Sequence, residues 1–336
     1  MLKSKREIWV DLTKIYACIL VVLGHLFQSY KSSELIANLC FFDWFNQVIY
    51  YFHVPLFFIC SGYLYQKYSK VTSFSQWRSF SAKKLVALGV PYFTFSFVTW
   101  FLKVVFPSAV NDSANGLLKT LFIAPLSPYW YLYALAVIFL IVCTIKKQGQ
   151  AIGFVAVALL LKCVAIFVPI GAPILKSILS NVIWFVIGML LCFWGDNLKI
   201  KKFKTHVLLL FAVVFLSFSI IIYYYNLRND TVAFLMGLFA CFITIAIALK
   251  FEEIDFLKSH VKRWAEYIFP VYLMHTIFAA ALRSVLFKIG IYDIYIHIIL
   301  GIAISFAGPI IALKIMSKLK WMEFFLYPTK VLKRRW

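Results

Sequence analysis

The segments HVLLLFAVVFLSFSIIIYYY (residues 206–225) and TVAFLMGLFACFITIAIAL (residues 231–249) decide the fold class of this chain. Neither contains Asp, Glu, Lys or Arg, and each has about the 20 residues that an α-helix needs to cross a bilayer. Similar apolar runs recur along all 336 residues, of which 63% are hydrophobic and only 14% charged. A water-soluble chain carries roughly a quarter charged residues. The sequence therefore predicts an all-α polytopic membrane protein.

Ten apolar runs are long enough to be transmembrane helices, and their continuous apolar character disfavours a membrane β-barrel. We predict spans at residues 8–28, 44–65, 86–106, 129–145, 151–169, 178–194, 206–225, 231–249, 266–287 and 292–313. The first run contains Asp11 and Lys14 and lacks a cleavage site of small residues, so we expect a retained helix rather than a signal peptide. No repeat or linker interrupts the pattern, and residues 1–336 are expected to form one domain.

The distribution of positive charge orients these helices. The net charge is +21, and placing the N-terminus in the cytoplasm puts most of the 34 Lys and Arg residues in cytoplasmic segments. An even number of spans then predicts that both termini are cytoplasmic. The charge lies in short connections and in a basic tail at residues 314–336, with no basic domain or recognition helix. This pattern indicates membrane lipids and an anionic cofactor as partners rather than nucleic acid.

Ionisable side chains within the apolar runs mark a candidate site, because such groups are costly inside a bilayer. The first predicted helix holds Asp11, Lys14 and His25. Asp11 and Lys14 are three residues apart and can form an ion pair on one helix face. His25 lies eleven residues further on the same face, about 16 Å along the axis. We expect a polar stripe from the cytoplasmic end of this helix toward its outer end; the alternative is an interfacial ion pair with His25 pointing outward.

The second predicted helix contains FHVPLFFICSGY at residues 52–63. Pro55 lacks an N–H and disturbs the turn before it, where His53 lies. A broken helix at membrane depth survives only where protein or water surrounds it, so we expect His53 to face the interior. His53 and His25 lie at a similar depth and could form a general base and its partner. The alternative is a structural His53 that hydrogen-bonds a carbonyl released by Pro55.

Six short motifs follow one another along nearly the whole chain. They are WVDLTK at residues 9–14 followed by His25, FHVPLFFICSG at 52–62, LVALGVPY at 85–92, WYLYAL at 130–135, WFVIGM at 184–189 and YLMH at 272–275. Together they resemble the acyltransferase 3 family of membrane enzymes, and within it the fucose 4-O-acetylase-like branch. The first two motifs are specific, whereas each of the others would be weak alone.

The resemblance implies a ten-helix acyltransferase of the bacterial cytoplasmic membrane. Its donor would be cytoplasmic acyl-CoA, commonly acetyl-CoA in this branch, and its acceptor a hydroxyl of a cell-surface or lipid-linked glycan. By similarity His25 is the catalytic histidine. Much of the family has Arg where this chain has Lys14, and Lys keeps the charge but loses the bidentate contact. No metal is expected, because the seven Cys form no ligand motif.

On the acceptor side, we expect His25 to act as general base for the acceptor hydroxyl, oriented by Asp11, His53 or another buried polar group. Direct transfer fits better than an acyl-enzyme, because no Ser or Cys lies in a nucleophile motif; Ser61 is a minor candidate. The fourth predicted span begins with Tyr129 and Trp130, which are candidates for contact with a sugar. The alternative is that they belong to the aromatic belt at the membrane surface.

On the donor side, we expect Asp11 to hold Lys14 or Arg6 near the phosphates of CoA. The basic loop 66–85 could bind the nucleotide, unless it is an ordinary positive-inside loop; its candidate cations are Arg78, Lys83 and Lys84. His275 lies about 12 Å into its span and either lines the donor channel or pairs with a neighbouring helix. Lys162 and Arg283, near outer helix ends, are expected to snorkel to the membrane surface.

A secondary transporter or proton-coupled flippase is the alternative function, because buried His, Asp and Lys also suit transport. Two observations count against it. The two halves of the chain contain no repeated pair of broken helices, and the intramembrane ionisable residues are concentrated in the first two spans.

Overall fold

The computed structural model describes residues 6–36, 40–69, 71, 73–107, 111–112, 115–195, 200 and 203–333. Residues 70 and 72 of the predicted basic loop and residues 334–336 of the predicted tail lie outside these ranges. Within them the chain is helical and contains no strand, which confirms the all-α fold class. The helices are α1 (Ile8–Ser32), α2 (Cys40–Ile49), α3 (His53–Tyr68), α4 (Phe74–Val105), α5 (Leu117–Phe122), α6 (Trp130–Ile141), α7 (Gln148–Phe167), α8 (Pro173–Trp194), α9 (Thr205–Tyr224), α10 (Asp230–Phe251), α11 (Asp255–Ala265), α12 (Ile268–Lys288), α13 (Ile294–Met316), α14 (Lys320–Leu326) and α15 (Pro328–Lys333).

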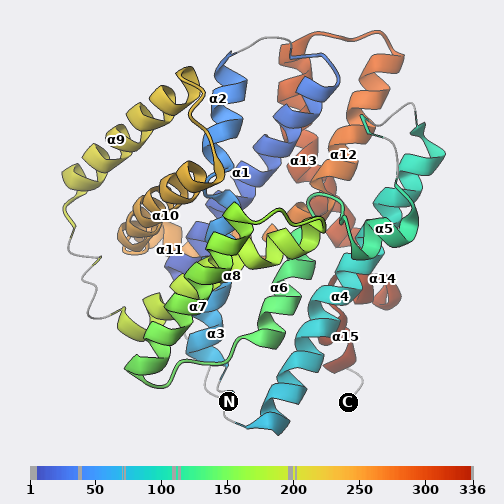
Figure 1. Cartoon of the computed structure of the whole chain (residues 1–336). Coiled ribbons are helices and arrows are strands. Elements are labelled where there is room, and N and C mark those ends of the chain that lie inside the picture. Colours follow the sequence, from blue (N-terminus) through green and yellow to red (C-terminus); the bar gives the residue numbers. More distant parts are fainter. Residues whose placement is uncertain are drawn as a thin grey trace.

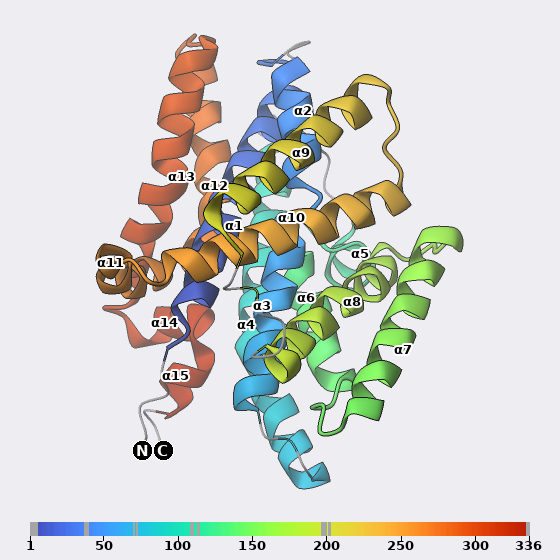
Figure 2. The same cartoon turned by 90° about the vertical axis from the view of Figure 1, so that its left-hand side faces the viewer.

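Nine segments of the described chain are long and apolar enough to cross a membrane, when α2 and α3 are taken together. The others are α1, α4, α7, α8, α9, α10, α12 and α13, and all nine coincide with predicted spans. In Figure 1, α1, α12 and α13 lie side by side, and contacts join each pair of them. Figure 2 shows α10 crossing the view at a steep angle to α13. The chain is therefore a multi-pass membrane protein.

The fourth predicted span, at residues 129–145, is wrong in length. Helix α6 has only 12 residues, about 18 Å, whereas the hydrocarbon core is about 30 Å thick. From Val142 the chain is extended, and α3 holds it there. The Tyr65 hydroxyl donates to the Val142 carbonyl at 2.8 Å, and the Gln66 amide bonds both the N–H and the C=O of Ile145, at 2.9 and 2.8 Å. These side chains take the place of the backbone hydrogen bonds that a further turn of α6 would make, so the helix ends at Ile141.

The second predicted span is interrupted, as its proline indicated. Helix α2 ends at Ile49 and α3 begins at His53. Pro55 is in the first turn of α3, where an N–H would have no partner within the helix. His53 Nδ1 donates to the Ile49 carbonyl at 2.5 Å and so caps α2. The hydrogen bond given as the structural alternative for His53 is therefore present, but to a carbonyl released by the end of α2 rather than by Pro55.

The predicted basic loop at residues 66–85 is wrong, because most of it is helix. Helix α4 begins directly after Ser73, whose hydroxyl oxygen accepts an N–H of the first turn at 3.3 Å. This is a favourable N-cap. The three cations expected on a flexible loop are instead fixed on the first turns of a 32-residue helix; they are Arg78, Lys83 and Lys84.

Helices α3 and α8 share the most extensive contact between two described helices. A Cβ placed on Gly62 would lie 1.9 Å from the Phe185 carbonyl oxygen, and one placed on Gly188 would lie 1.9 Å from the Ile59 carbonyl oxygen. Small residues at such crossings let the backbones approach closely. The second and fifth of the six sequence motifs therefore meet here, and this contact fixes α3 beneath the candidate site.

The predicted basic tail, beginning at residue 314, is folded against the helical body. Helix α13 continues to Met316, and both α14 and α15 contact α4. Glu323 is only 3% exposed and pairs with Lys330 at 2.6 Å. Figures 1 and 2 show that α1 begins and α15 ends at the same end of the molecule. This is the arrangement expected for a chain whose two termini lie on one side of the membrane.

Candidate active site

Two of the cavities that α1 lines, toward opposite ends of the helix, contain the predicted site residues, and we name these two after the expected orientation. The outer cavity has a volume of about 250 Å³ and is lined by side chains from α1, α3, α6, α7, α8, α10 and α12, among them His25 and His53. The inner cavity has a volume of about 550 Å³ and is lined by residues of α1, α3, α4 and α6, among them Arg6, Lys14 and Lys84. The polar stripe predicted along α1 therefore ends in a different cavity on each side.

His25 is half-buried and faces the outer cavity rather than lipid. Its Nε2 lies 3.4 Å from the Ser127 hydroxyl. His53 lines the same cavity, so the structure brings the two imidazoles to one site. Because a carbonyl can only accept, His53 Nδ1 carries the proton in its bond to Ile49, and its Nε2 keeps a lone pair.

The imidazole rings of His275 and His25 are in contact, with 5.4 Å between the ring centroids. Its Nδ1 donates to the carbonyls of Val271 and Tyr272 at 2.9 and 3.0 Å, so its Nε2 is an acceptor. That Nε2 is buried and has no hydrogen-bond partner among the described residues. His275 does not line the inner cavity. Of its two predicted placements, the geometry supports the one in which it pairs with a neighbouring helix.

The inner cavity is cationic. Asp11 pairs with Arg6 and not with Lys14, so the predicted Asp11–Lys14 pair is wrong. Lys14 has no carboxylate within 4 Å among the described residues. Lys84 reaches the cavity from α4, with its Nζ 4.3 Å from the centroid of the Phe139 ring. Two ammonium groups that lack carboxylate partners therefore line this cavity, which suits an anionic ligand.

The ends of α1 and α3 are joined beside this cavity by Glu7. Lys67 pairs with Glu7 at 2.7 Å, and the Tyr68 hydroxyl donates to the same oxygen at 2.8 Å. Partial burial alone would raise the pKa of Glu7, but the bonds from Lys67 and Tyr68 outweigh it and hold the pKa below its ordinary value. Glu7 is therefore a carboxylate at neutral pH and fixes the start of α1.

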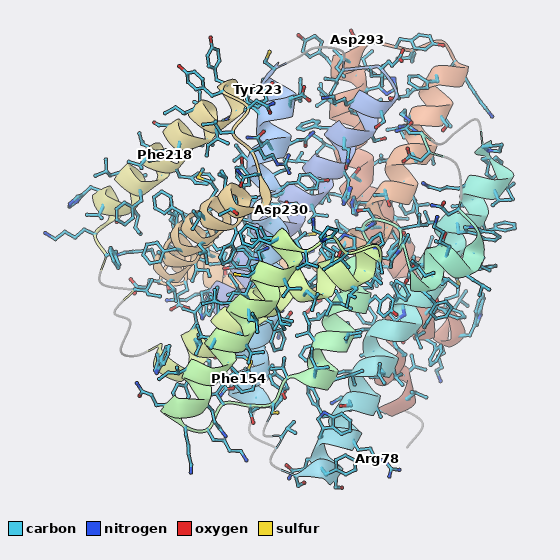
Figure 3. The ribbon with its side chains drawn as sticks, in the orientation of Figure 1. Arg78, Phe154, Phe218, Tyr223, Asp230 and Asp293 are labelled. Carbon is cyan, nitrogen blue, oxygen red and sulfur yellow. The ribbon has the colours of Figure 1, made fainter. Side chains whose placement is uncertain are left out.

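Two predicted CoA ligands lie outside both cavities. Arg78 and Lys83 are exposed on the first turns of α4. Figure 3 shows Arg78 at the lower end of the view, far from the centre of the molecule. The structure thus brings Arg6, Lys14 and Lys84 together and leaves the other two cations at the surface.

Three aromatic rings contact one another between residues that line the two cavities, and we refer to them as the aromatic partition. They are Phe57, Tyr131 and Tyr272, whose ring centroids are 5.7 to 6.0 Å apart. Tyr272 lines the outer cavity, and the Tyr131 hydroxyl lies 3.3 Å from that of Ser61 in the inner cavity. Ser61, expected on the acceptor side together with His25, therefore lines the inner cavity and not the outer cavity that holds His25.

The two aromatic residues expected to contact a sugar have different surroundings. Tyr129 is completely buried, its hydroxyl donates to the Leu273 carbonyl at 3.0 Å, and it lies 2.8 Å from the Thr99 hydroxyl. It is therefore out of reach of an acceptor and also of a membrane-surface belt. Trp130 lines the outer cavity. Of this pair, only Trp130 can meet a bound sugar.

Sequence reasoning missed a group of charges in the outer cavity. Lys162 lines this cavity, so the prediction that it snorkels is wrong. Lys176 and Asp230 line it too and pair at 2.9 Å; Figure 3 shows Asp230 near the centre of the view. The available signal was weak: one lysine within α7 and two charges in the first turns of α8 and α10. Arg283 is also not a snorkelling cation, because it is 4% exposed and donates to the Ser29 carbonyl at 3.1 Å.

Comparison with known proteins adds one result. The model of a family described as an acyltransferase domain, acyltransferase 3, matches residues 7–314. This range includes the six motifs and all lining residues of the two cavities except Arg6. No curated protein and no solved structure matches the chain.

Proposed function

This chain belongs to the acyltransferase 3 family, and on that premise we propose that it transfers an acetyl group from cytoplasmic acetyl-CoA to a hydroxyl of a glycan. The chain is thus a membrane acyltransferase, which leaves no need for the transporter alternative. The proposed acceptor is a cell-surface or lipid-linked glycan, and the proposed location is the bacterial cytoplasmic membrane. The resemblance of WVDLTK and His25 to the fucose 4-O-acetylase-like branch supports O-acetyl transfer.

One observation carries the proposal: helix α1 presents Lys14 to the cationic inner cavity and His25 to the outer cavity. CoA is a polyanion, and Arg6, Lys14 and Lys84 are placed to receive its phosphates from the cytoplasmic side. The acceptor hydroxyl meets His25 in the outer cavity. The thioester reaches it past the aromatic partition, between Ser61 and Tyr272.

The reaction that we propose is direct transfer. His25 takes the proton of the acceptor hydroxyl as its oxygen attacks the thioester carbonyl. The tetrahedral intermediate collapses, the C–S bond breaks, and the CoA sulfur leaves with the proton that His25 returns. His275 would act as a positioning residue, because its Nε2 can accept the Nδ1–H of His25 and direct the other nitrogen of His25 toward the cavity. His53 remains a second candidate for this role.

The experiment uses inverted membrane vesicles from cells that express the chain, supplied with acetyl-labelled CoA. Label should enter the glycan fraction with the wild-type chain. His25→Ala should lower this transfer roughly 100-fold or more, which is the typical contribution of a general base. His206→Ala is the matched control, because His206 is an exposed histidine on α9. Undiminished transfer by His25→Ala, or passage of an unacylated solute without transfer, would contradict the proposal.

A further inference from the structure

The charged side chains of the outer cavity do not balance. Two cations and one anion line it: Lys162, Lys176 and Asp230. Lys176 and Asp230 pair at 2.9 Å and satisfy each other. Lys162 has no carboxylate within 4 Å among the described residues; it interacts electrostatically with Asp230, which is already paired with Lys176, and its Nζ lies 5.2 Å from the centroid of the Phe234 ring. One positive charge in the cavity is therefore left without an anion.

The position of Lys162 makes this imbalance informative. It lies within α7, in an apolar segment long enough to span the membrane, and its side chain is only partly exposed. Withdrawing an ammonium group from water is costly unless an anion compensates. A lysine of a membrane-spanning helix that turns into a cavity already holding an equal number of other positive and negative groups indicates that the cavity receives an anion.

The other lining residues suit a sugar. Trp130 and Trp184 supply aromatic faces, and Ser127, Ser180 and Asn181 supply hydroxyl and amide groups. Binding sites of this kind combine apolar surface with a few polar groups that fix orientation. The pair formed by Lys176 and Asp230 adds hydrogen-bonding capacity without adding net charge.

We infer that the acceptor is an acidic sugar, whose carboxylate or phosphate binds Lys162 while its hydroxyl lies at His25. This inference rests on the proposed function, because His25 defines where the reacting hydroxyl lies. Carboxylate and phosphate share the chemistry that Lys162 recognises, namely a compact oxyanion that pairs with an ammonium group. The experiment must therefore tell these two sources apart.

The test is a calorimetric titration of the purified protein in detergent, without acyl-CoA. The three probes are glucuronate, glucose 6-phosphate and methyl glucoside. At least one of the two anions should bind about tenfold more tightly than the neutral glucoside, a difference of about 1.4 kcal/mol. The tighter of the two anions identifies carboxylate or phosphate as the source of the charge.

Three variants assign the preference to Lys162. Lys162→Met should abolish it, Lys162→Arg should keep most of it, and Lys288→Met should leave it unchanged, since Lys288 is exposed in the last turn of α12. Equal binding of all three sugars, lack of saturable binding by either anion, or a preference that survives Lys162→Met would overturn the inference.

A kinetic measurement separates this inference from the proposed function. In the vesicle assay, Lys162→Met should raise the KM for an anionic acceptor about tenfold and leave kcat nearly unchanged. A fall in kcat with unchanged KM would overturn the subsite, because it would make Lys162 part of the chemical step. Because the titration uses no acyl donor, anion binding can fail while acetyl transfer persists, and transfer can fail while anion binding persists.

Discussion

Neighbouring residues in the sequence differ sharply in their surroundings on α4. The ammonium of Lys84 reaches the inner cavity and lies over the Phe139 ring, whereas Lys83 is exposed. Lys84→Met should raise the KM for acetyl-CoA about tenfold, roughly the value of one charge-assisted hydrogen bond. Lys83→Met is the matched control and should leave this KM unchanged. Steady-state kinetics over a range of acetyl-CoA concentrations measure both, and equal effects would refute a specific role for Lys84.

The pairing of His275 with His25 gives a second prediction at this scale. His275→Ala removes the acceptor beside His25 and should lower kcat roughly tenfold or more, about 1.4 kcal/mol, with little change in the KM for acetyl-CoA. His275→Gln, whose side-chain oxygen can replace Nε2, should recover much of this loss. If both variants lose the same activity together with thermal stability, the role of His275 is only structural.

Single residues also show what the sequence could and could not predict. His25 and His53 were placed at one depth by counting from the ends of two spans, because helical periodicity relates positions within a span. His275 was not placed beside His25, since the two are on α1 and α12 and no periodicity relates helices 250 residues apart. Lys162 was misread for the same reason: its burial depends on α8 and α10, which α7 meets only in the folded chain.

At the scale of helices, the crossing of α3 and α8 is the most sensitive contact. Gly188→Ala places a methyl group where the Ile59 carbonyl lies and should destabilise the protein by roughly 1–3 kcal/mol. Gly153→Ala on α7 is the control, because a Cβ there has no atom within 4 Å and removes a helix-disfavouring glycine. Thermal unfolding of both purified variants checks this. An unfolding midpoint of Gly188→Ala at or above that of Gly153→Ala would show that α3 and α8 can move apart without loss of stability.

The contact between the start of α1 and the end of α3 should depend on pH. The pKa of Glu7 is lowered in the folded protein, so its stabilising effect is full above its unfolded pKa of about 4.3 and is lost as the pH falls through the lower folded value. The midpoint temperature of thermal unfolding of Glu7→Gln should therefore lie below that of the wild type at pH 7, and the difference between the two midpoints should disappear in acid. Asp112→Asn, in an exposed segment, should show no such gap. A gap of constant size down to pH 3 would argue against this ion pair.

The lengths of the helices show where local patterns fail. Hydropathy located nine long spans correctly and Pro55 indicated the break before it, since both signals are properties of contiguous residues. It made the span at 129–145 too long, because apolar composition cannot reveal that Tyr65 and Gln66 hold the chain extended after α6. It also placed the start of α4 too late, since the basic first turns of that helix lie outside the apolar run.

At the scale of the whole molecule, the aromatic partition controls what passes between the two cavities. Tyr131→Ala removes its central ring and should let water reach the thioester, so hydrolysis of acetyl-CoA without an acceptor should increase several-fold. Tyr224→Ala, at a 78% exposed tyrosine of α9, is the matched control. Release of free CoA in the absence of glycan measures this. Unchanged hydrolysis in a folded Tyr131→Ala variant would show that other residues exclude water.

The aromatic partition has a consequence for the energetics of the host cell. A protein with deep polar cavities on both faces of a bilayer could act as a pore and discharge the electrochemical gradient. We expect the packed rings of Phe57, Tyr131 and Tyr272 to interrupt a continuous file of water and so to deny protons and small ions a conducting route. An acetyl group is uncharged and does not need a hydrated pathway. Cells could therefore carry many copies of this enzyme at work without loss of proton-motive force.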